Sequence, residues 1–280
     1  DYRGLDQKVM PEALLTDICG QQFDVVFVTV KCHQLPGVAQ QLLSMTHEQS
    51  ELIFMQNGLG SFDAIAAKMV QRRCLLGITP FNVLQNGAHF HKGTEGEFCL
   101  EQSANTQLIA QTLKDSDFGC HIYDDMKPIV FGKLLLNLNN ALNAIADMPI
   151  KTELENKSIR RTLAGAMREW LAVAKAMDCE MAQFTKVKPA QVPMILRLPN
   201  WLFKRVASAM LDIDPKARSS MWEDIHAGRK TEVEFLNGAV VRLGKQHHIP
   251  TPINQAIVEC IHQLERGELV DIARLTVMKS

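Results

Sequence analysis

An apolar stretch from Pro128 to Ile145 carries one lysine and four asparagines, and it constrains the fold of this chain more than any other feature. At about 100° per residue, Lys133, Asn137 and Asn140 fall on one face of a helix, and leucines cover the rest of its surface. Burying an ammonium group and several amides is costly unless each group finds a partner. The stretch therefore predicts a buried helix with a polar seam, which either bonds a neighbouring helix or faces a ligand.

A second segment, beginning at Ser219, shows apolar residues at helical spacing as far as Leu243. This pattern predicts one long helix that ends near Gly244. Glu232 lies on its apolar face, where a helix would normally place leucine. A carboxylate there needs a cation or a hydrogen-bond donor, and Lys133 is the candidate partner. The pair is expected either to fix helix packing as a buried ion pair or to belong to a functional site.

Six short segments share their order and rough spacing with one enzyme family. They are Val28–Gln34, Gln56–Gly60, Gly132–Asn137, Ser219–Asp224, Gly228–Gly238 and Gly244–Asn254. Each is weak alone, since Asn-Gly-Leu-Gly also occurs as a simple turn. Together they resemble the 2-dehydropantoate 2-reductase, or ketopantoate reductase, family over nearly the whole chain from about residue 20 onward.

Strands and helices alternate in the first part of the chain. Strands are expected at 24–31, 51–55 and 75–78, with helices near 37–45 and 64–70 between them. This order predicts a parallel sheet with crossover helices, extended by antiparallel strands within 83–100 and an edge strand at 121–123. Helical periodicity takes over from Pro128. We therefore expect an α/β protein with a partial dinucleotide-binding Rossmann-like domain at 1–125 and an all-helical substrate-binding and dimerisation domain at 126–280.

The resemblance also implies a feature that this sequence lacks. Family members open with a strand, a Gly-x-Gly-x-x-Gly loop and a helix that hold the cofactor pyrophosphate. No such pattern occurs among these 280 residues, and the chain opens on Asp1. The expectation is a chain truncated by at least one βαβ unit, on the order of 30 residues. The alternative is a natural variant that has lost cofactor binding.

The resemblance assigns roles to residues of the second domain. Lys133 matches the general acid that protonates the reduced carbonyl, and Glu232 matches the acidic residue that orients this lysine or binds a substrate hydroxyl. Asn137, Asn140 and Ser220 are the expected contacts of the substrate's polar oxygens. For Ser220 the alternative role is that of a helix N-cap, since serine is favoured there and Glu223 follows three residues later.

Cofactor contacts are expected where strands end, because the carboxyl ends of parallel strands line the ligand crevice. Lys31 and Gln34 resemble residues beside the adenosine and pyrophosphate, and Asn57 resembles an asparagine near the nicotinamide ribose. The cofactor implied is NADPH. The segment Pro215–Arg218 departs from the pattern because it offers no amide where familiar members have an asparagine. The asparagine spacing after Asn137 is also one residue shorter than in some members.

Composition excludes several other classes of function. The net charge is −1 and there is no basic run, which argues against nucleic-acid binding. Seven cysteines form no Cys-x-x-Cys pair, as expected of reduced thiols in a cytoplasmic enzyme. No apolar run predicts a membrane span, and the nine histidines suggest no metal site even where His89 and His91 share a strand face.

The sequence therefore predicts NADPH-dependent reduction of 2-dehydropantoate to pantoate in pantothenate biosynthesis. Two alternatives remain open: a reductase of a different 2-keto acid, and a non-catalytic binding protein on the same scaffold. The small-molecule keto acid is the expected partner. The stretch Arg197–Trp201 is a candidate for a lid or for an oligomer contact such as that of a homodimer.

Overall fold

The computed structural model describes residues 20–81, 83–92, 96–114, 119–207 and 214–276. The chain forms two compact units, one of residues 1–56 and 61–126 and one of residues 57–60 and 127–280. The boundary drawn from the sequence lies one residue before the observed one. The segment 57–60 was not expected in the helical unit, although it follows a strand of the first.

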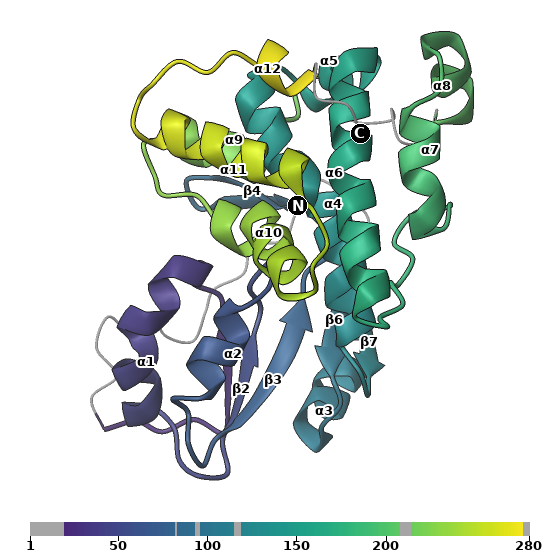
Figure 1. Cartoon of the computed structure of the whole chain (residues 1–280). Helices are drawn as coiled ribbons and strands as arrows, with labels where there is room; N and C mark the ends of the chain where they lie inside the picture. The colour runs from purple at the N-terminus through teal and green to yellow at the C-terminus, as the bar shows by residue number, and fades with distance from the viewer. Residues whose placement is uncertain (1–19, 82, 93–95, 115–118, 208–213, 277–280) are drawn as a thin grey trace. The chain divides into compact units, whose positions relative to one another are not determined.

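A five-stranded sheet forms the frame of the first unit (Figure 1). Its strands, in spatial order, are β1 (Val25–Val28), β2 (Glu51–Phe54), β3 (Arg73–Ile78), β6 (Phe98–Glu101) and β7 (Cys120–Tyr123). The first three are parallel, β6 is antiparallel to β3, and β7 is parallel to β6. A separate hairpin pairs β4 (Val83–Asn86) with β5 (His89–Lys92). The predicted parallel sheet with an antiparallel extension is confirmed.

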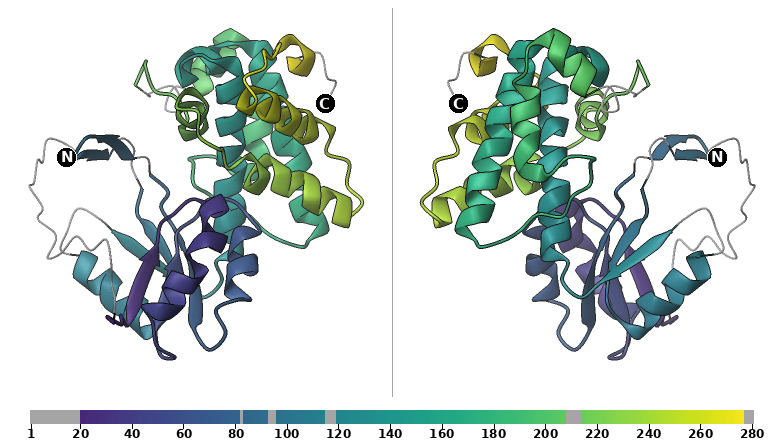
Figure 2. Two further views of the ribbon diagram at one scale, coloured as in Figure 1. Left: turned by 90° about the vertical axis from the view of Figure 1, so that its left-hand side faces the viewer. Right: turned by 90° about the vertical axis from the view of Figure 1, so that its right-hand side faces the viewer.

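Helices cover both faces of this sheet, as the alternation along β2 requires. Leu52 and Phe54 pack with residues of α1 (Leu35–Ser44) and α2 (Ser61–Ala66). Ile53 points to the other face, where it packs beside Ile109 of α3 (Ala104–Leu113). Figure 2 shows the sheet between these two layers. Because β2 is covered on both sides, every one of its residues is buried.

The described residues of the second unit form helices and 3₁₀ turns joined by loops, without a strand. Its elements are α4 (Lys127–Ala146), α5 (Ile150–Glu155), α6 (Lys157–Ala176), the 3₁₀ turn η2 (Pro189–Gln191), α7 (Val192–Leu196), α8 (Asn200–Val206), α9 (Ser220–His226), the 3₁₀ turn η4 (Val233–Phe235), α10 (Asn237–Gln246), α11 (Pro252–Glu265) and α12 (Ala273–Thr276). The helix predicted from the polar seam is α4, and it contacts α6, α9 and α11.

Helix α4 forms the core of this unit. Leu134, Leu138 and Leu142 are fully buried, and Trp170 of α6 donates its indole N–H to the carbonyl of Phe131 at 3.0 Å. Among the described residues α4 is long and apolar enough to cross a membrane, but 72% of its most apolar window is buried inside the protein. That burial is typical of the core helix of a globular domain.

The prediction of one continuous helix from Ser219 to Gly244 is wrong. Helix α9 ends after His226, and Gly228 follows with φ of 63°, where its N–H donates to the carbonyl of Ile225. A glycine in this conformation ends a helix, although at helical spacing it also passes as an apolar position. Glu232 therefore lies just before η4 rather than inside a helix. Gly244 lies inside α10, which ends at Gln246.

Candidate active site

A small pocket that opens to solvent lies in the helical unit. It is lined by Asn57, Asn140, Ser220, Met221, Asp224, Glu232 and Leu236. Four of these residues, Asn57, Asn140, Ser220 and Glu232, were predicted as site residues from the sequence. They come from the segment 57–60, from α4, from α9 and from the turn before η4, so the fold brings together positions that are far apart in the chain.

Asn57 reaches this pocket because the turn that follows it is docked onto η4. The N–H of Leu59 donates to the carbonyl of Phe235 at 2.8 Å, and Arg242 donates to the carbonyl of Leu59 at 3.0 Å. Gly58 has φ of 85°, and a Cβ on it would lie 2.1 Å from the Phe235 carbonyl oxygen. The turn thus requires glycine for both its conformation and its close approach.

The polar seam of α4 divides into two parts. Lys133, Asn137 and Asn140 are half-buried on one face, and the Asn137 amide donates to Oδ1 of Asn57 at 3.3 Å. Asn143, by contrast, is fully buried and hydrogen-bonded within the helical unit. The helix thus has a buried hydrogen-bond network at Asn143, and Asn140 lines the pocket. That this face of α4 binds a ligand stays a prediction. That Lys133 pairs with Glu232 stays a prediction.

Ser219, not Ser220, caps α9. The Ser219 hydroxyl accepts from the N–H of Trp222 at 3.1 Å and donates to the carbonyl of Asn140 at 2.9 Å. Its own N–H donates to Oδ1 of Asn143 at 2.9 Å. The alternative role of Ser220 as the N-cap is therefore wrong. Ser220 is the first residue of α9, and its exposed side chain lines the pocket.

Asp224 is a pocket residue that the sequence reasoning missed. The residue is only 3% exposed, and its Oδ1 accepts from Nε of Arg229 at 2.9 Å. It follows Ser220 by four residues, so both lie on one face of α9. This four-residue spacing from Ser220 is the sequence pattern from which Asp224 could have been predicted as a pocket residue. With Glu232, the pocket holds two carboxylates, which suit the recognition of donors such as hydroxyl or ammonium groups.

The residues expected to contact the cofactor lie in two places. Lys31 precedes η1 (Cys32–Gln34) at the end of β1, and its N–H donates to the side-chain oxygen of Gln34 at 3.0 Å. At the end of β2, the Gln56 amide donates to the carbonyls of Val28 and Val30, both at 2.8 Å. Lys31 and Gln34 therefore lie in the first unit, whereas Asn57 lies in the second.

Two buried polar atoms at these strand ends have no hydrogen-bond partner among the described residues, Nδ1 of His33 and Oε1 of Gln56. Buried polar groups are usually paired, so their location at the carboxyl ends of β1 and β2 is consistent with a ligand there. The described residues fit the strand-end part of a dinucleotide site. The sequence contains no Gly-x-Gly-x-x-Gly loop for the pyrophosphate.

No group of three or more histidine, cysteine or acidic side chains suited to a metal ion occurs among the residues that the structure describes. His89 and His91 lie on the exposed strand β5.

Comparison with known proteins gives matches along most of the chain. Residues 3–105 match the family model described as "Ketopantoate reductase PanE/ApbA", and residues 125–265 match the one described as "Ketopantoate reductase PanE/ApbA C terminal". A 2-dehydropantoate 2-reductase from Archaeoglobus fulgidus is 25% identical over 275 residues, which cover 95% of this chain and 85% of that protein.

Solved structures show the same fold. A dimeric ketopantoate reductase from Staphylococcus aureus aligns with a TM-score of 0.72 and 21% identity, over 90% of this chain and 80% of that one. D-mandelate dehydrogenase bound to NADH and anilino(oxo)acetate aligns with a TM-score of 0.72 and 21% identity, over 88% of this chain and 77% of that one. At such identities the likeness concerns the fold alone.

Proposed function

This chain belongs to the ketopantoate reductase PanE/ApbA family, and we propose that it reduces 2-dehydropantoate to pantoate with NADPH, a step of pantothenate biosynthesis. The pocket is the observation that carries this proposal. It gathers an amide from Asn57, an amide from Asn140 and the Ser220 hydroxyl beside two carboxylates. A hydroxylated 2-keto acid offers a carboxylate, a carbonyl and a hydroxyl, and these are the groups that such side chains bind.

Lys133 is the proposed proton donor. It precedes Asn137 by one helical turn on the same face of α4, and Asn137 contacts Asn57 at the pocket. An ammonium group there polarises the substrate carbonyl and then donates its proton to the oxygen that becomes the new hydroxyl. Glu232 holds the lysine in its charged form or accepts a hydrogen bond from a substrate hydroxyl. Asn140 and Ser220 orient the substrate.

NADPH would supply the hydride that adds to the carbonyl carbon. Lys31, Gln34 and the strand-end atoms of His33 and Gln56 would hold part of this cofactor. Because the 280 residues contain no glycine-rich phosphate loop, we expect the chain as printed to bind NADPH weakly. A fusion protein that places a βαβ unit with a glycine-rich phosphate loop ahead of Asp1 is expected to bind it more tightly. Equal affinity of the two proteins in calorimetric titration would contradict this expectation.

We also propose that the protein works in the cytoplasm as a homodimer. The Staphylococcus aureus protein of the same fold is described as dimeric. Six cysteines lie among the described residues, and all are free thiols, as in a reducing compartment. Sedimentation of the purified chain tests the dimer, and a monomer at all concentrations would exclude it.

The decisive variants of the fusion protein are Lys133→Ala and Glu232→Ala, assayed by the loss of reduced nicotinamide absorbance with 2-dehydropantoate. Lys133→Ala should lower kcat by roughly two to four powers of ten, the usual contribution of a positioned general acid. If the two residues act as a unit, the double variant should lose far less than the sum of the single losses. Full activity of Lys133→Ala would refute the mechanism.

A second candidate is the reduction of a different 2-keto acid. It is favoured by the segment Pro215–Arg218, which carries no amide where familiar family members have an asparagine. The D-mandelate dehydrogenase structure shows that this fold also holds an aryl keto-acid analogue in that protein. The two candidates predict different substrate preferences with the same dependence on Lys133. A non-catalytic binding protein would bind a keto acid without turnover.

A further inference from the structure

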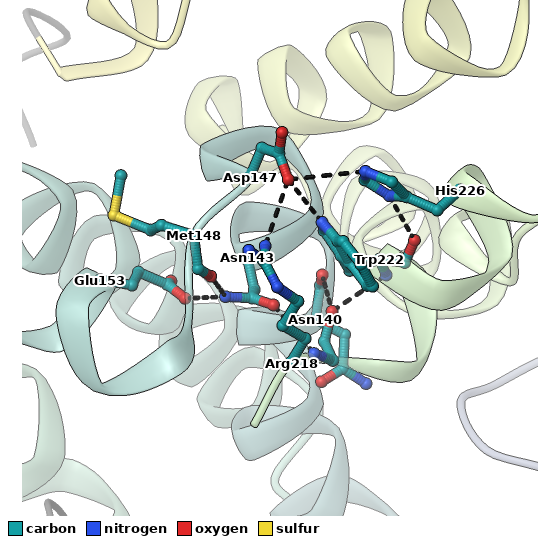
Figure 3. A network of polar contacts seen from close by, with 9 residues as sticks. Asn140, Asn143, Asp147, Met148, Glu153, Arg218, Trp222 and His226 are labelled. Carbon is teal, nitrogen blue, oxygen red and sulfur yellow. Dashed lines mark hydrogen bonds and ion pairs between the residues drawn. The ribbon is translucent and has the colours of Figure 1, made fainter. Parts of the chain in front are cut away.

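Two buried side chains connect α4 to α5 (Figure 3). Asn143 of α4 is fully buried, and Glu153 of α5 is 1% exposed. The Asn143 amide nitrogen donates to Oε2 of Glu153 at 2.6 Å and to the carbonyl of Met148 at 2.9 Å. Neither side chain lines the pocket, so the substrate contacts proposed above do not account for them.

The orientation of the Asn143 amide is fixed by its other partners. Its nitrogen faces a carbonyl oxygen, that of Met148, and its oxygen faces a backbone N–H, that of Ser219. A flipped amide would oppose oxygen to oxygen and N–H to N–H, so only the observed orientation is allowed. The amide nitrogen therefore donates to Oε2 of Glu153, and this oxygen must be an acceptor.

The other carboxyl oxygen, Oε1 of Glu153, is buried and has no hydrogen-bond partner among the described residues. Oδ1 of Asn139 is also buried without a partner there. A carboxylate would leave one charged oxygen unpaired in the protein interior, which is costly. A proton on Oε1 removes this charge from the protein interior.

Burial of the Glu153 carboxyl group raises its pKa and so favours the same protonated form. It raises the pKa of Glu153 from 4.5 to about 8, against smaller lowering effects from Asn143 and Asn139. Glu153 is therefore neutral over most of the range in which proteins work.

Charged groups on the elements packed around Glu153, other than Lys151, have other partners. The charged groups there are Arg160 of α6, Asp147 after α4, Arg218 before α9, and Lys151 and Glu155 of α5 itself. Arg160 donates to the carbonyls of Leu154, Leu196 and Leu198 and to Asn200. Arg218 pairs with Asp147, and Lys204 pairs with Glu155. None of these charges is among the causes that set the pKa of Glu153, which leaves burial and two amides.

The contacts lead from Glu153 to the pocket in three steps. Glu153 holds Asn143, Asn143 accepts from the N–H of Ser219, and the Ser219 hydroxyl caps α9 and bonds the backbone of α4 at Asn140. Ser220 is the next residue and lines the pocket. We propose that Glu153, in its protonated form, is a positioning residue that fixes the first turn of α9 through Asn143 and Ser219 and so sets the place of Ser220. Its effect on substrate affinity rests on the proposed function.

The variant Glu153→Gln keeps the shape of the side chain but removes its ability to lose a proton. Glutamine has nearly the size of the protonated acid, and its oxygen accepts from Asn143, but it cannot ionise. Glu155→Gln is the matched control, since Glu155 is a partly exposed carboxylate on the same helix. The fusion protein is assayed at about pH 6.5 and about pH 9.5, on either side of the titration of Glu153.

KM is measured for the keto acid that the fusion protein reduces best. Between about pH 6.5 and about pH 9.5, the factor by which KM increases should be roughly five times larger in the unaltered sequence than in Glu153→Gln. The values of kcat should change in parallel in the two proteins. Glu155→Gln should follow the unaltered sequence. An identical pH dependence of KM in Glu153→Gln and in the unaltered sequence would overturn the proposal.

A second measurement needs no activity. Amide hydrogen exchange at residues 219–222 is compared between Glu153→Gln and the unaltered sequence at each pH, so that the intrinsic effect of pH cancels. The two rates should agree at about pH 6.5, and exchange in the unaltered sequence should be roughly fivefold faster at about pH 9.5. Equal rates at both pH values would exclude the positioning role. If no keto acid is reduced, the proposed function fails while this comparison still decides the role of Glu153.

Discussion

Replacing Gly58 by alanine tests how Asn57 is held at the pocket. Alanine at φ of 85° costs about 1–2 kcal/mol in backbone conformation. A Cβ 2.1 Å from the Phe235 carbonyl oxygen also forces the turn away from η4, which breaks the hydrogen bond from Leu59, worth about 0.5–1.5 kcal/mol net. Gly58→Ala should therefore lower the free energy of unfolding by about 1.5–3.5 kcal/mol in urea denaturation. Since Asn57 moves with the turn, KM for the keto acid should rise as well.

Gly267→Ala is the matched control. Gly267 has φ of 75°, and a Cβ there would meet nothing within 4 Å. This variant carries the same backbone strain of about 1–2 kcal/mol without the collision, and it should leave KM unchanged. The unfolded-state effect of replacing glycine is common to both variants and cancels in their difference. Equal destabilisation by the two variants, with KM unchanged in both, would refute the reasoning that the turn is docked onto η4.

Three further predictions concern the helical unit. Ser219→Ala removes the cap of α9, so it should lower the free energy of unfolding by about 0.5–2 kcal/mol in urea denaturation and raise KM. Ser220→Ala should also raise KM, but it should change the free energy of unfolding by less than about 0.5 kcal/mol. Equal stability losses in the two variants would contradict the assignment of the cap. Trp170→Phe removes the donor to the Phe131 carbonyl and should cost about 1 kcal/mol with KM unchanged; no loss would mean that this bond is not formed. The folded-state pKa of Glu153 is raised, so its contribution to stability is fully present below pH 4.5 and is lost as pH rises through about 8. Relative to Glu153→Gln, the free energy of unfolding should therefore fall by at most about 5 kcal/mol across that range, and parallel pH profiles would exclude the raised pKa.

The sequence was sufficient to predict features that depend on local periodicity. The polar seam of α4 follows from a helical repeat within one segment, and the order of β1, β2 and β3 follows from alternating strands and helices. Asn140, Ser220 and Glu232, to which the resemblance assigns roles, line one pocket. The roles themselves stay proposals.

Features that depend on tertiary contacts or on backbone conformation were not predicted. Gly228 fits an apolar stripe as well as a helix end, and only its positive φ shows that α9 stops there. Of two adjacent serines, either could cap α9, and the bonds of Ser219 to α4 decide between them. The segment 57–60 follows a strand of the first unit. Its hydrogen bond to Phe235, far away in the chain, cannot be predicted from any local sequence pattern.

The most direct test of the proposed function is the substrate preference of the fusion protein with NADPH. The value of kcat/KM is measured for 2-dehydropantoate, for pyruvate and for phenylglyoxylate, the keto acid that corresponds to mandelate, with Ser220→Ala as the pocket variant. We expect kcat/KM to be at least roughly tenfold higher for 2-dehydropantoate than for the other two keto acids. The reason is that only 2-dehydropantoate carries a hydroxyl for the polar groups of the pocket, which are those of Asn57, Asn140, Ser220 and Glu232. Ser220→Ala should therefore weaken this preference. Faster reduction of phenylglyoxylate, or a preference that Ser220→Ala leaves unchanged, would contradict the proposal.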